Sequence, residues 1–135
     1  MPDVTYRNAT AADVPGILAL WREFWSEQPY EANLEPKIES EPDTVYVAEA
    51  DGRIVGTIVG GFDGWWGWLY RIAVTEAYQG QGIGTQLVEQ MERRLKAKGA
   101  TGACAIVSPE NAKINQVLQK MGYTDRGYRT LGRRL

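Results

Sequence analysis

A strand, a glycine-rich loop and a long helix follow one another in the middle of this chain, and this arrangement constrains the fold more than any other feature. The apolar run at 68–74 leads through a short turn to Gly80, Gly82 and Gly84, where a helical pattern begins. Because glycine has no Cβ, such a loop can turn sharply and point several N–H groups into one concavity. The helix adds unpaired donors and a partial positive charge at its first turn. The segment is therefore predicted to cradle a phosphate group without a lysine.

Two β-branched runs precede this unit. They cover 44–50 and 53–61 and flank Asp51-Gly52, which is a strong signal for a two-residue hairpin turn. Together with 68–74 they predict a meander of three strands.

Hydrophobic periodicity predicts the remaining elements. A helix is expected to begin at Thr10 or Asp13, with an apolar face that reaches Trp25. Ser108 is predicted to cap the last helix, which ends at Gly122. The other expected elements are a short helix at 34–40, strands at 4–7 and 103–107, and one or two closing strands with Tyr123, Tyr128 and Leu131 in the core.

Length and composition exclude several classes of protein. A chain of 135 residues is predicted to form a single domain, 1–135. Its net charge of −2 argues against a nucleic-acid partner. No apolar run approaches the roughly 20 residues that cross a bilayer, and Met1-Pro2-Asp3 starts no signal region, so we expect no membrane partner and a cytoplasmic location. Histidine is absent and Cys104 is the single cysteine, which argues against a metal site and the common hydrolytic sites.

The charges are unevenly distributed along the sequence. Between Ser26 and Asp43, six acidic residues stand against Lys37, whereas four arginines and no acid occupy 126–135. Such runs are usually solvated surface, and a role in recognising a charged partner is the alternative.

The spacing of the glycines narrows the range of ligands that the loop could bind. Thr85 stands where a dinucleotide fingerprint needs its third glycine, and no Lys-Ser or Lys-Thr pair follows the loop as a P-loop requires. A plain glycine turn that packs the helix on the sheet remains the alternative to a phosphate cradle.

The segment 74–84 resembles the acetyl-CoA-binding motif of the GNAT superfamily of N-acetyltransferases, Gln/Arg-x-x-Gly-x-Gly/Ala after a strand. Asn111 and the later pair Gly122-Tyr123 resemble a second motif of that family, and the order of elements matches over the whole chain. The resemblance implies an α+β fold in three layers: a mixed, mostly antiparallel sheet of six to seven strands with helices on both faces. It also implies a splay between 68–74 and 103–107 that holds acetyl-CoA.

The same resemblance implies direct transfer of the acetyl group from the thioester to a primary amine of a small molecule or peptide. It assigns the pantetheine arm to the backbone of Ile72, Ala73 and Val74, and Asn111 to the pantetheine or to the ordering of the site. The diphosphate is expected at the N–H groups of Gln79, Gly80, Gln81, Gly82, Ile83, Gly84 and Thr85.

The resemblance is weakest at the proton-transfer groups. The position where the family often has a tyrosine is Leu118, whose spacing fits the core. Asp63 is the candidate to anchor or deprotonate the amine, with a hairpin-turn role as the alternative, and Glu76 is the second candidate. The acidic segment corresponds to a region that roofs the acceptor site in the family, so the acceptor is expected to be cationic. A non-catalytic acyl-CoA-binding module, and a monomer or a homodimer, remain open.

Overall fold

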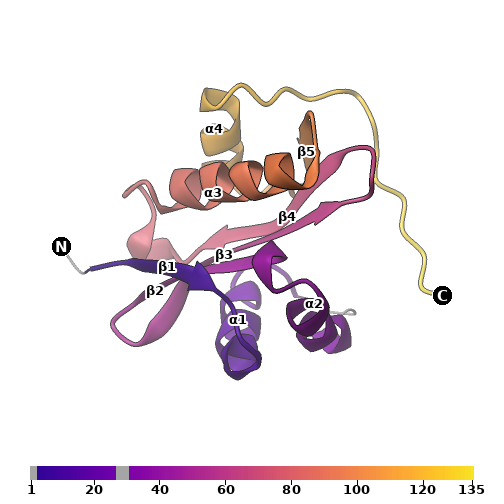
Figure 1. Cartoon of the computed structure of the whole chain (residues 1–135). Coiled ribbons are helices and arrows are strands. Elements are labelled where there is room, and N and C mark those ends of the chain that lie inside the picture. Colours follow the sequence, from indigo (N-terminus) through magenta and orange to yellow (C-terminus); the bar gives the residue numbers. More distant parts are fainter. Residues whose placement is uncertain (1–2, 27–30) are drawn as a thin grey trace.

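A computed structural model of the chain describes residues 3–26 and 31–135 and contains a five-stranded sheet (Figure 1). The strands lie in chain order, with the first four antiparallel and the last pair parallel. They are β1 (Thr5–Asn8), β2 (Val45–Ala50), β3 (Arg53–Phe62), β4 (Gly67–Val74) and β5 (Ala103–Ala105).

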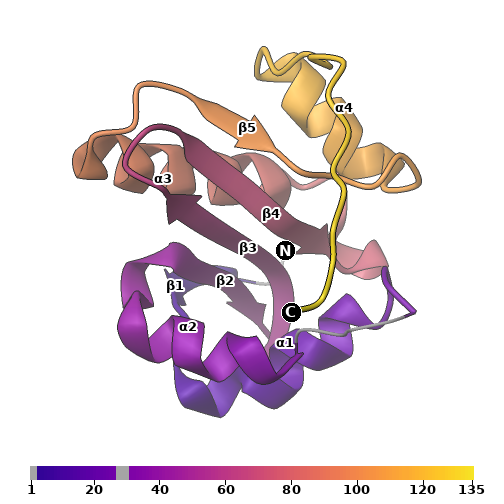
Figure 2. The same cartoon turned by 90° about the vertical axis from the view of Figure 1, so that its right-hand side faces the viewer.

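Helices cover both faces of this sheet, which confirms the expected three-layer α+β arrangement (Figures 1 and 2). One face carries α1 (Val14–Trp21) and α2 (Leu34–Ser40), and the other carries α3 (Ile83–Lys98) and α4 (Ala112–Lys120). A buried apolar cluster fills each interface. The short 3₁₀ turns are η1 (Ala11–Asp13), η2 (Glu31–Asn33), η3 (Pro42–Thr44) and η4 (Glu76–Tyr78).

Local signals in the sequence account for most of these boundaries. Asp51 and Gly52 both have positive φ, as a tight hairpin turn between β2 and β3 requires. Asp13 is the N-cap of α1, and the proline that follows lies in its first turn. The last helix begins after Asn111, so the predicted cap at Ser108 is wrong by three positions. Within the described residues, no helix is long and apolar enough to cross a membrane.

The expectation of six to seven strands is not met, because the residues after Tyr123 form no strand in the structure. Tyr123 packs against the cluster beneath α3, but Tyr128 and Leu131 are 85% and 83% exposed. A strand needs a neighbouring edge to pair with, and β5 offers three residues. Apolar and aromatic residues in the tail are therefore not enough to add the closing strands.

A β-bulge interrupts β4. Val59 of β3 pairs with Tyr70 and Thr57 pairs with Ala73, so two residues of β4, Arg71 and Ile72, face the single residue between them. The first of the two, Arg71, has a φ of 50° in the left-handed region. Sequence analysis gave no sign of this bulge, because the position holds neither glycine nor asparagine.

Beyond the bulge, β4 separates from β5. The parallel pairing runs from Gly67 with Ala103 to Leu69 with Ala105, and the last backbone bond joins the Ile106 N–H to the Leu69 carbonyl at 2.8 Å. Since β4 continues to Val74, its C-terminal half has no strand on this side. The predicted splay is therefore present, and Figure 2 shows β4 and β5 diverging.

Candidate active site

A cavity of about 440 Å³ lies where β4 and β5 separate. One wall comes from the residues just after α1, and the other comes from the start of α4 and the loop before it. The lining residues are Glu23, Phe24, Trp25, Gln79, Ser108, Glu110, Asn111, Ala112 and Lys113. Two of the predicted coenzyme residues, Gln79 and Asn111, therefore share one cavity. Lys113 adds a cation that sequence analysis did not include.

Two side chains hold carbonyl groups of β4 at this cavity. The Asn111 amide donates to the Ile72 carbonyl at 3.1 Å, and the Gln79 amide donates to the Val74 carbonyl at 2.9 Å. This bond is the contact expected if Asn111 orders the site, and Asn111 is also the N-cap residue of α4. Ala73 lies between Ile72 and Val74 in β4. Its backbone pairs with Thr57 of β3, and its side chain is buried on the face of the sheet that α1 and α2 cover.

The three loop glycines have different physical roles. Gly80 and Gly82 have φ values of 78° and 85°, and no atom lies within 4 Å of a Cβ added to either. They are needed for the shape of the loop that opens the sixteen-residue helix α3. Gly84 instead lies in the interface with α4, where an added Cβ would be 3.3 Å from the Ile114 side chain.

The other residues of the predicted phosphate loop differ in exposure. Gln81 is exposed, Thr85 is half-buried, and the Ile83 side chain lies in the core beneath α3. The loop therefore presents backbone donors and the helix N-terminus, which together favour an anion.

A hydrogen-bonded chain links α1 to the bulge. The Trp21 indole donates to the Thr57 hydroxyl at 2.9 Å, and this hydroxyl donates to the Arg71 carbonyl at 2.9 Å. Thr57 is fully buried. Sequence analysis could not find this contact, because Trp21 and Thr57 are 36 positions apart.

The Arg71 side chain lies over two aromatic rings. Its guanidinium carbon is 4.5 Å from the centre of the Trp25 ring and 5.1 Å from the centre of the Trp21 ring. Burial lowers the pKa of Arg71 below its usual value.

Glu23 is a carboxylate that sequence analysis missed. It follows α1, lines the cavity, and accepts a 2.7 Å hydrogen bond from the Thr75 hydroxyl. Thr75 in turn accepts a bond of 3.4 Å from Arg53. No local signal marks Glu23, since its partner is 52 positions away.

Asp63, the first candidate base, lies in the turn between β3 and β4. Its carboxylate accepts bonds from the N–H groups of Trp65 and Trp66 at 2.8 and 2.7 Å, and from the Trp68 indole at 3.2 Å. These bonds lower the pKa of Asp63. The turn joins the N-terminal end of β4, whereas the glycine loop follows its C-terminal end. The structure does not bring Asp63 together with the coenzyme residues.

The other proton-transfer candidates lie apart from the cavity lining. Glu76 is exposed at the start of η4. Leu118 is buried in the core, as its spacing predicted. The Tyr123 hydroxyl donates to Glu92 of α3 at 2.6 Å, and burial together with this carboxylate raises the pKa of Tyr123.

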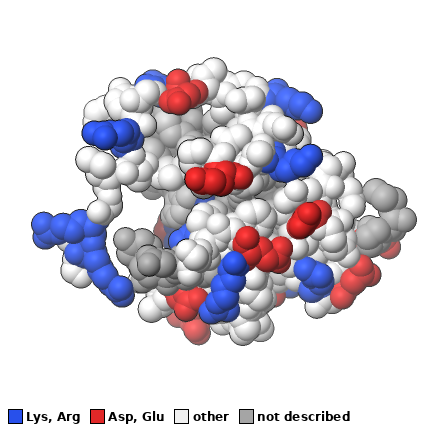
Figure 3. Space-filling view, turned by 180° about the vertical axis from the view of Figure 1, so that it is seen from behind, with Lys and Arg blue, Asp and Glu red and all other residues white. Residues whose placement is uncertain are grey.

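Three of the six acidic residues in the segment form ion pairs. Glu31 pairs with Arg22, Glu41 with Lys37, and Asp43 with Lys98, at 2.8 to 2.9 Å. Residues 27–30 lie outside the described part of the chain. On the face shown in Figure 3, acidic and basic side chains are interspersed and neither sign dominates.

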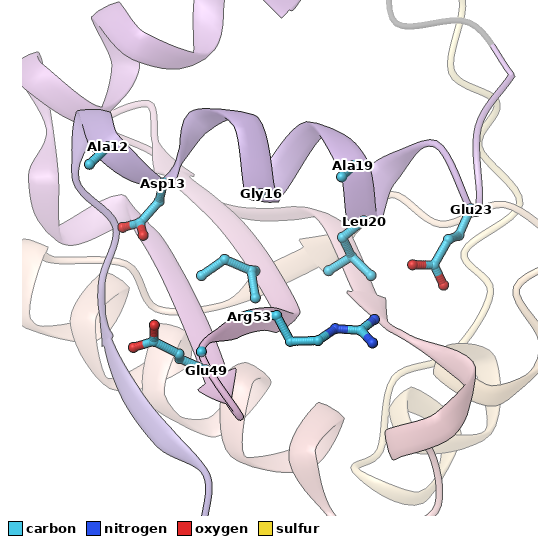
Figure 4. A pocket seen from close by; sticks show the side chains of 10 residues that line it. Ala12, Asp13, Gly16, Ala19, Leu20, Glu23, Glu49 and Arg53 are labelled. Carbon is cyan, nitrogen blue, oxygen red and sulfur yellow. The ribbon is translucent and has the colours of Figure 1, made fainter.

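A second cavity of about 310 Å³ lies on the side of α1 that faces the β2–β3 hairpin (Figure 4). Asp13 and Glu49 line one end of it, and both bond to Arg7, at 2.7 and 3.2 Å. Glu23 lines the other end, so its carboxylate stands between the two cavities.

Residues 14–123 match the model of the acetyltransferase (GNAT) family. The chain is a GNAT acetyltransferase. It is 32% identical over 126 residues to acetyltransferase ECA0875 of Pectobacterium atrosepticum, covering 91% of this chain and 89% of that protein. Acetyltransferase plu1384 of Photorhabdus laumondii is 33% identical over 117 residues, covering 84% of this chain and 82% of that protein.

Solved structures share the fold of this GNAT acetyltransferase. Aminoglycoside N-acetyltransferase AAC(6')-Iy in complex with CoA superposes with a TM-score of 0.76 at 21% identity, covering 99% of this chain and 96% of that one. Ard1 from Thermoplasma volcanium gives a TM-score of 0.78 at 19% identity, covering 90% and 82%. Membership of the family makes the chain an enzyme with acetyl-CoA as its acetyl donor, rather than a non-catalytic acyl-CoA-binding module.

Proposed function

We propose that this GNAT acetyltransferase transfers the acetyl group of acetyl-CoA directly to a primary amine of a small molecule or peptide. One observation carries the proposal: the carbonyls of Ile72 and Val74 and the glycine loop lie along the same cleft. The side-chain amides of Asn111 and Gln79 hold these two carbonyls in place. A pantetheine arm has alternating amide groups, so it can add to this free edge as an extra strand does.

The coenzyme contacts follow from this alignment. Pantetheine bonds to the backbone of Ile72 and Val74, on either side of Ala73, whose own backbone pairs with Thr57 of β3. Asn111 contacts pantetheine while it bonds to the Ile72 carbonyl. The diphosphate lies at the N-terminus of α3, where it accepts bonds from the N–H groups of Gly80, Gln81, Gly82, Ile83, Gly84 and Thr85. The Gln79 N–H already donates to the Glu76 carbonyl at 3.2 Å, so Gln79 acts through its side chain. Lys113, which lines the same cavity, supplies a positive charge to this end of the cleft.

The amine must lose a proton before it attacks, since an alkyl ammonium has a pKa of roughly 10. Two carboxylates line the cavity, Glu23 and Glu110. Glu110 bonds to Ser108 in the loop before α4, whereas Glu23 bonds to Thr75 directly after β4, so Glu23 is our first candidate to anchor the ammonium and accept the proton. Asp63 and Glu76 remain the candidates that follow from the sequence. An acceptor that arrives as a cation is attracted by any of these carboxylates.

The leaving group needs less assistance. A thiol has a pKa of roughly 8.5, so coenzyme A can depart as the thiolate and take a proton afterwards. This chemistry is compatible with a leucine at position 118, which has no proton to give. Holding both reactants in one cleft supplies much of the rate enhancement.

Within the family, we propose a resemblance to the small bacterial acetyltransferase YpeA. It rests on the segment 60–64, the glycine loop and the C-terminal residues 131–135.

Thiol release from acetyl-CoA, measured across a panel of amines and peptides, tests the proposed reaction. We expect amine-stimulated release that falls at least tenfold in Glu23→Gln, with the KM for acetyl-CoA changed less than about twofold. Arg93→Gln is the matched control, since Arg93 is exposed on α3 and bonds only locally to Gln90. Tight coenzyme binding with no release from any amine would contradict the reaction.

A further inference from the structure

The guanidinium of Arg71 is a half-buried cation that stacks on aromatic rings and has no counter-ion among the described residues. Arginine carries five N–H donors. Across residues 3–26 and 31–135, the structure gives the Arg71 side chain no hydrogen bond and no ion pair, although it lies 4.5 Å from the Trp25 ring centre. The neighbouring ring surfaces therefore orient the planar guanidinium group but accept no hydrogen bond from its N–H groups.

Two contacts place Arg71 next to the active-site cavity. Trp25, on which the guanidinium stacks, also lines that cavity. The next residue along β4, Ile72, has its carbonyl bonded to Asn111, which lines the same cavity from the other side. The Arg71 backbone is therefore one residue away from the strand edge proposed to hold the donor, and its guanidinium lies beside a residue that lines the cavity.

The backbone at Arg71 is unfavourable for an arginine. Its φ of 50° is the left-handed conformation, which glycine or asparagine adopts more easily. The bulge itself is fixed through backbone and hydroxyl groups, by Thr57 and Trp21. A strained arginine at a site where a smaller residue would build the same bulge indicates that the side chain has a function.

We propose that Arg71 binds a carboxylate of the acetyl acceptor, so that the acceptor is a small amine that also carries a carboxylate, such as an amino acid. This inference deepens the proposed acetyl transfer and rests on it. A guanidinium accepts a carboxylate through two parallel N–H···O bonds, which gives direction as well as affinity. Ion pairs with Arg22, Lys37 and Lys98 offset three of the six acidic charges of the segment 26–43, so this segment is less anionic than its composition predicts.

The reaction then proceeds with Arg71 holding one end of the acceptor. The ammonium gives one proton to Glu23 or water, and its nitrogen forms a bond to the thioester carbonyl carbon. The C–S bond breaks with its electrons on sulfur, the nitrogen loses a second proton, and the thiolate takes up one proton. The products are an N-acetylated carboxylate, coenzyme A and one released proton.

Matched acceptors test the proposal in steady-state kinetics. Each amino acid is compared with its own amide, which keeps the amine and removes the carboxylate charge. We expect the acids to exceed the amides at least tenfold in kcat/KM, the size of effect that a charge-assisted pair produces. Arg71→Gln should raise the KM for the acids about tenfold or more, with the KM for acetyl-CoA within about twofold. Equal use of acids and amides by the wild-type enzyme would overturn the proposal.

Two further variants separate recognition from folding. Arg71→Asn accommodates the left-handed backbone and should lose the preference for acids while keeping the thermal midpoint. Arg71→Lys keeps the charge without the fork and should retain part of the preference. Arg93→Gln should behave as the wild type. A preference for acids that survives in both Arg71→Asn and Arg71→Gln would also overturn the proposal.

Tryptophan fluorescence separates this inference from the acetyl transfer on which it rests, because Trp21 and Trp25 both contact the guanidinium. Amino acids and their amides are titrated into the wild type and Arg71→Gln in the presence of coenzyme A. Arg71-dependent binding of acids without any thiol release would overturn the transfer and support the carboxylate site. Thiol release with no difference between acids and amides, in rate or in binding, would support the acetyl transfer and overturn the carboxylate site.

Discussion

The hydroxyl of Thr57 in β3 donates a 2.9 Å hydrogen bond to the carbonyl of Arg71 in β4, at the point where β4 carries an extra residue. The same hydroxyl accepts the indole N–H of Trp21, so one buried oxygen connects α1 to the bulge. Beyond the bulge, β4 turns its free edge toward the cleft. The buried hydroxyl of Thr57 therefore connects α1 to the part of β4 that leads into the active site.

Replacing Thr57 by valine should destabilise the protein and weaken coenzyme binding. The substitution keeps the shape but leaves the Trp21 N–H and the Arg71 carbonyl unpaired, at a cost of about 2 kcal/mol or more in the free energy of unfolding. Urea denaturation measures this cost, and the KM for acetyl-CoA should rise. Thr57→Ser keeps the hydroxyl and should cost less than about 1 kcal/mol. Equal stability of the two variants would contradict this role.

Two glycines in the same loop should respond differently to the same substitution. Gly82→Val places a β-branched residue at a φ of 85° and should raise the KM for acetyl-CoA at least tenfold, because the loop must change shape. Gly84→Val instead inserts its side chain against Ile114, so the free energy of unfolding should fall by about 1–3 kcal/mol.

Gly82→Asn is the matched control for the loop, since asparagine tolerates the left-handed conformation, and it should stay closer to the wild type than valine. Coenzyme kinetics and urea denaturation are measured on all three variants. The assignment of roles is wrong if Gly84→Val impairs the coenzyme more than Gly82→Val does.

The success of the sequence analysis at the glycine loop and its failure at Arg71 have the same origin. Gly80, Gly82 and the Asp51-Gly52 turn reveal their backbone conformation through residue type alone. Arg71 adopts a similar conformation because Thr57 and Trp21 impose it, and no local pattern reports contacts across the fold. Tyr128 and Leu131 illustrate the opposite error, because apolar residues predict a core strand only where a neighbouring strand is available to pair with.

Replacement of Asn111 should affect the donor more than the acceptor. Asn111→Ala removes the bond to the Ile72 carbonyl and should raise the KM for acetyl-CoA about fivefold to tenfold, in line with the loss of one hydrogen bond. Asn111→Asp should be worse, because a carboxylate cannot donate to that carbonyl and repels an anionic coenzyme. An unchanged KM for acetyl-CoA in both variants would remove Asn111 from the coenzyme site.

Variants of Asp63 distinguish its turn role from the role of a base. Asp63→Asn keeps an oxygen for the N–H groups of Trp65 and Trp66, so the turn role predicts a nearly unchanged kcat. Asp63→Ala removes all three bonds and should lower the thermal midpoint. A fall in kcat of about a hundredfold or more in Asp63→Asn would instead support general base catalysis.

Asp13 should contribute an acid-sensitive part of the stability. The Arg7 guanidinium holds the pKa of Asp13 at about 2, below its usual 3.8. A carboxyl whose pKa is lower in the folded state stabilises the fold above its unfolded pKa, and this contribution disappears as the pH falls through the folded pKa. The difference in stability between the wild type and Asp13→Asn should thus be constant from pH 7 to 5 and shrink between pH 4 and 2.

The amount lost in that pH range should be about 1 kcal/mol, since Arg7 is part-exposed and water screens the pair. Urea midpoints measured for both proteins at each pH provide the test. A difference that stays constant down to pH 2 would show that Asp13 does not act through its charge.

The bulge also sets a length scale. The residue that offers a cationic fork and the residue that offers a donor-strand carbonyl are adjacent in β4, so their Cα atoms are separated by one peptide unit of about 3.8 Å. The sheet therefore fixes the backbone of both residues relative to each other, and movement of the surrounding loops leaves these two positions unchanged. The rotamer of the Arg71 side chain, which Trp21 and Trp25 contact, then sets the distance between the guanidinium and the strand edge.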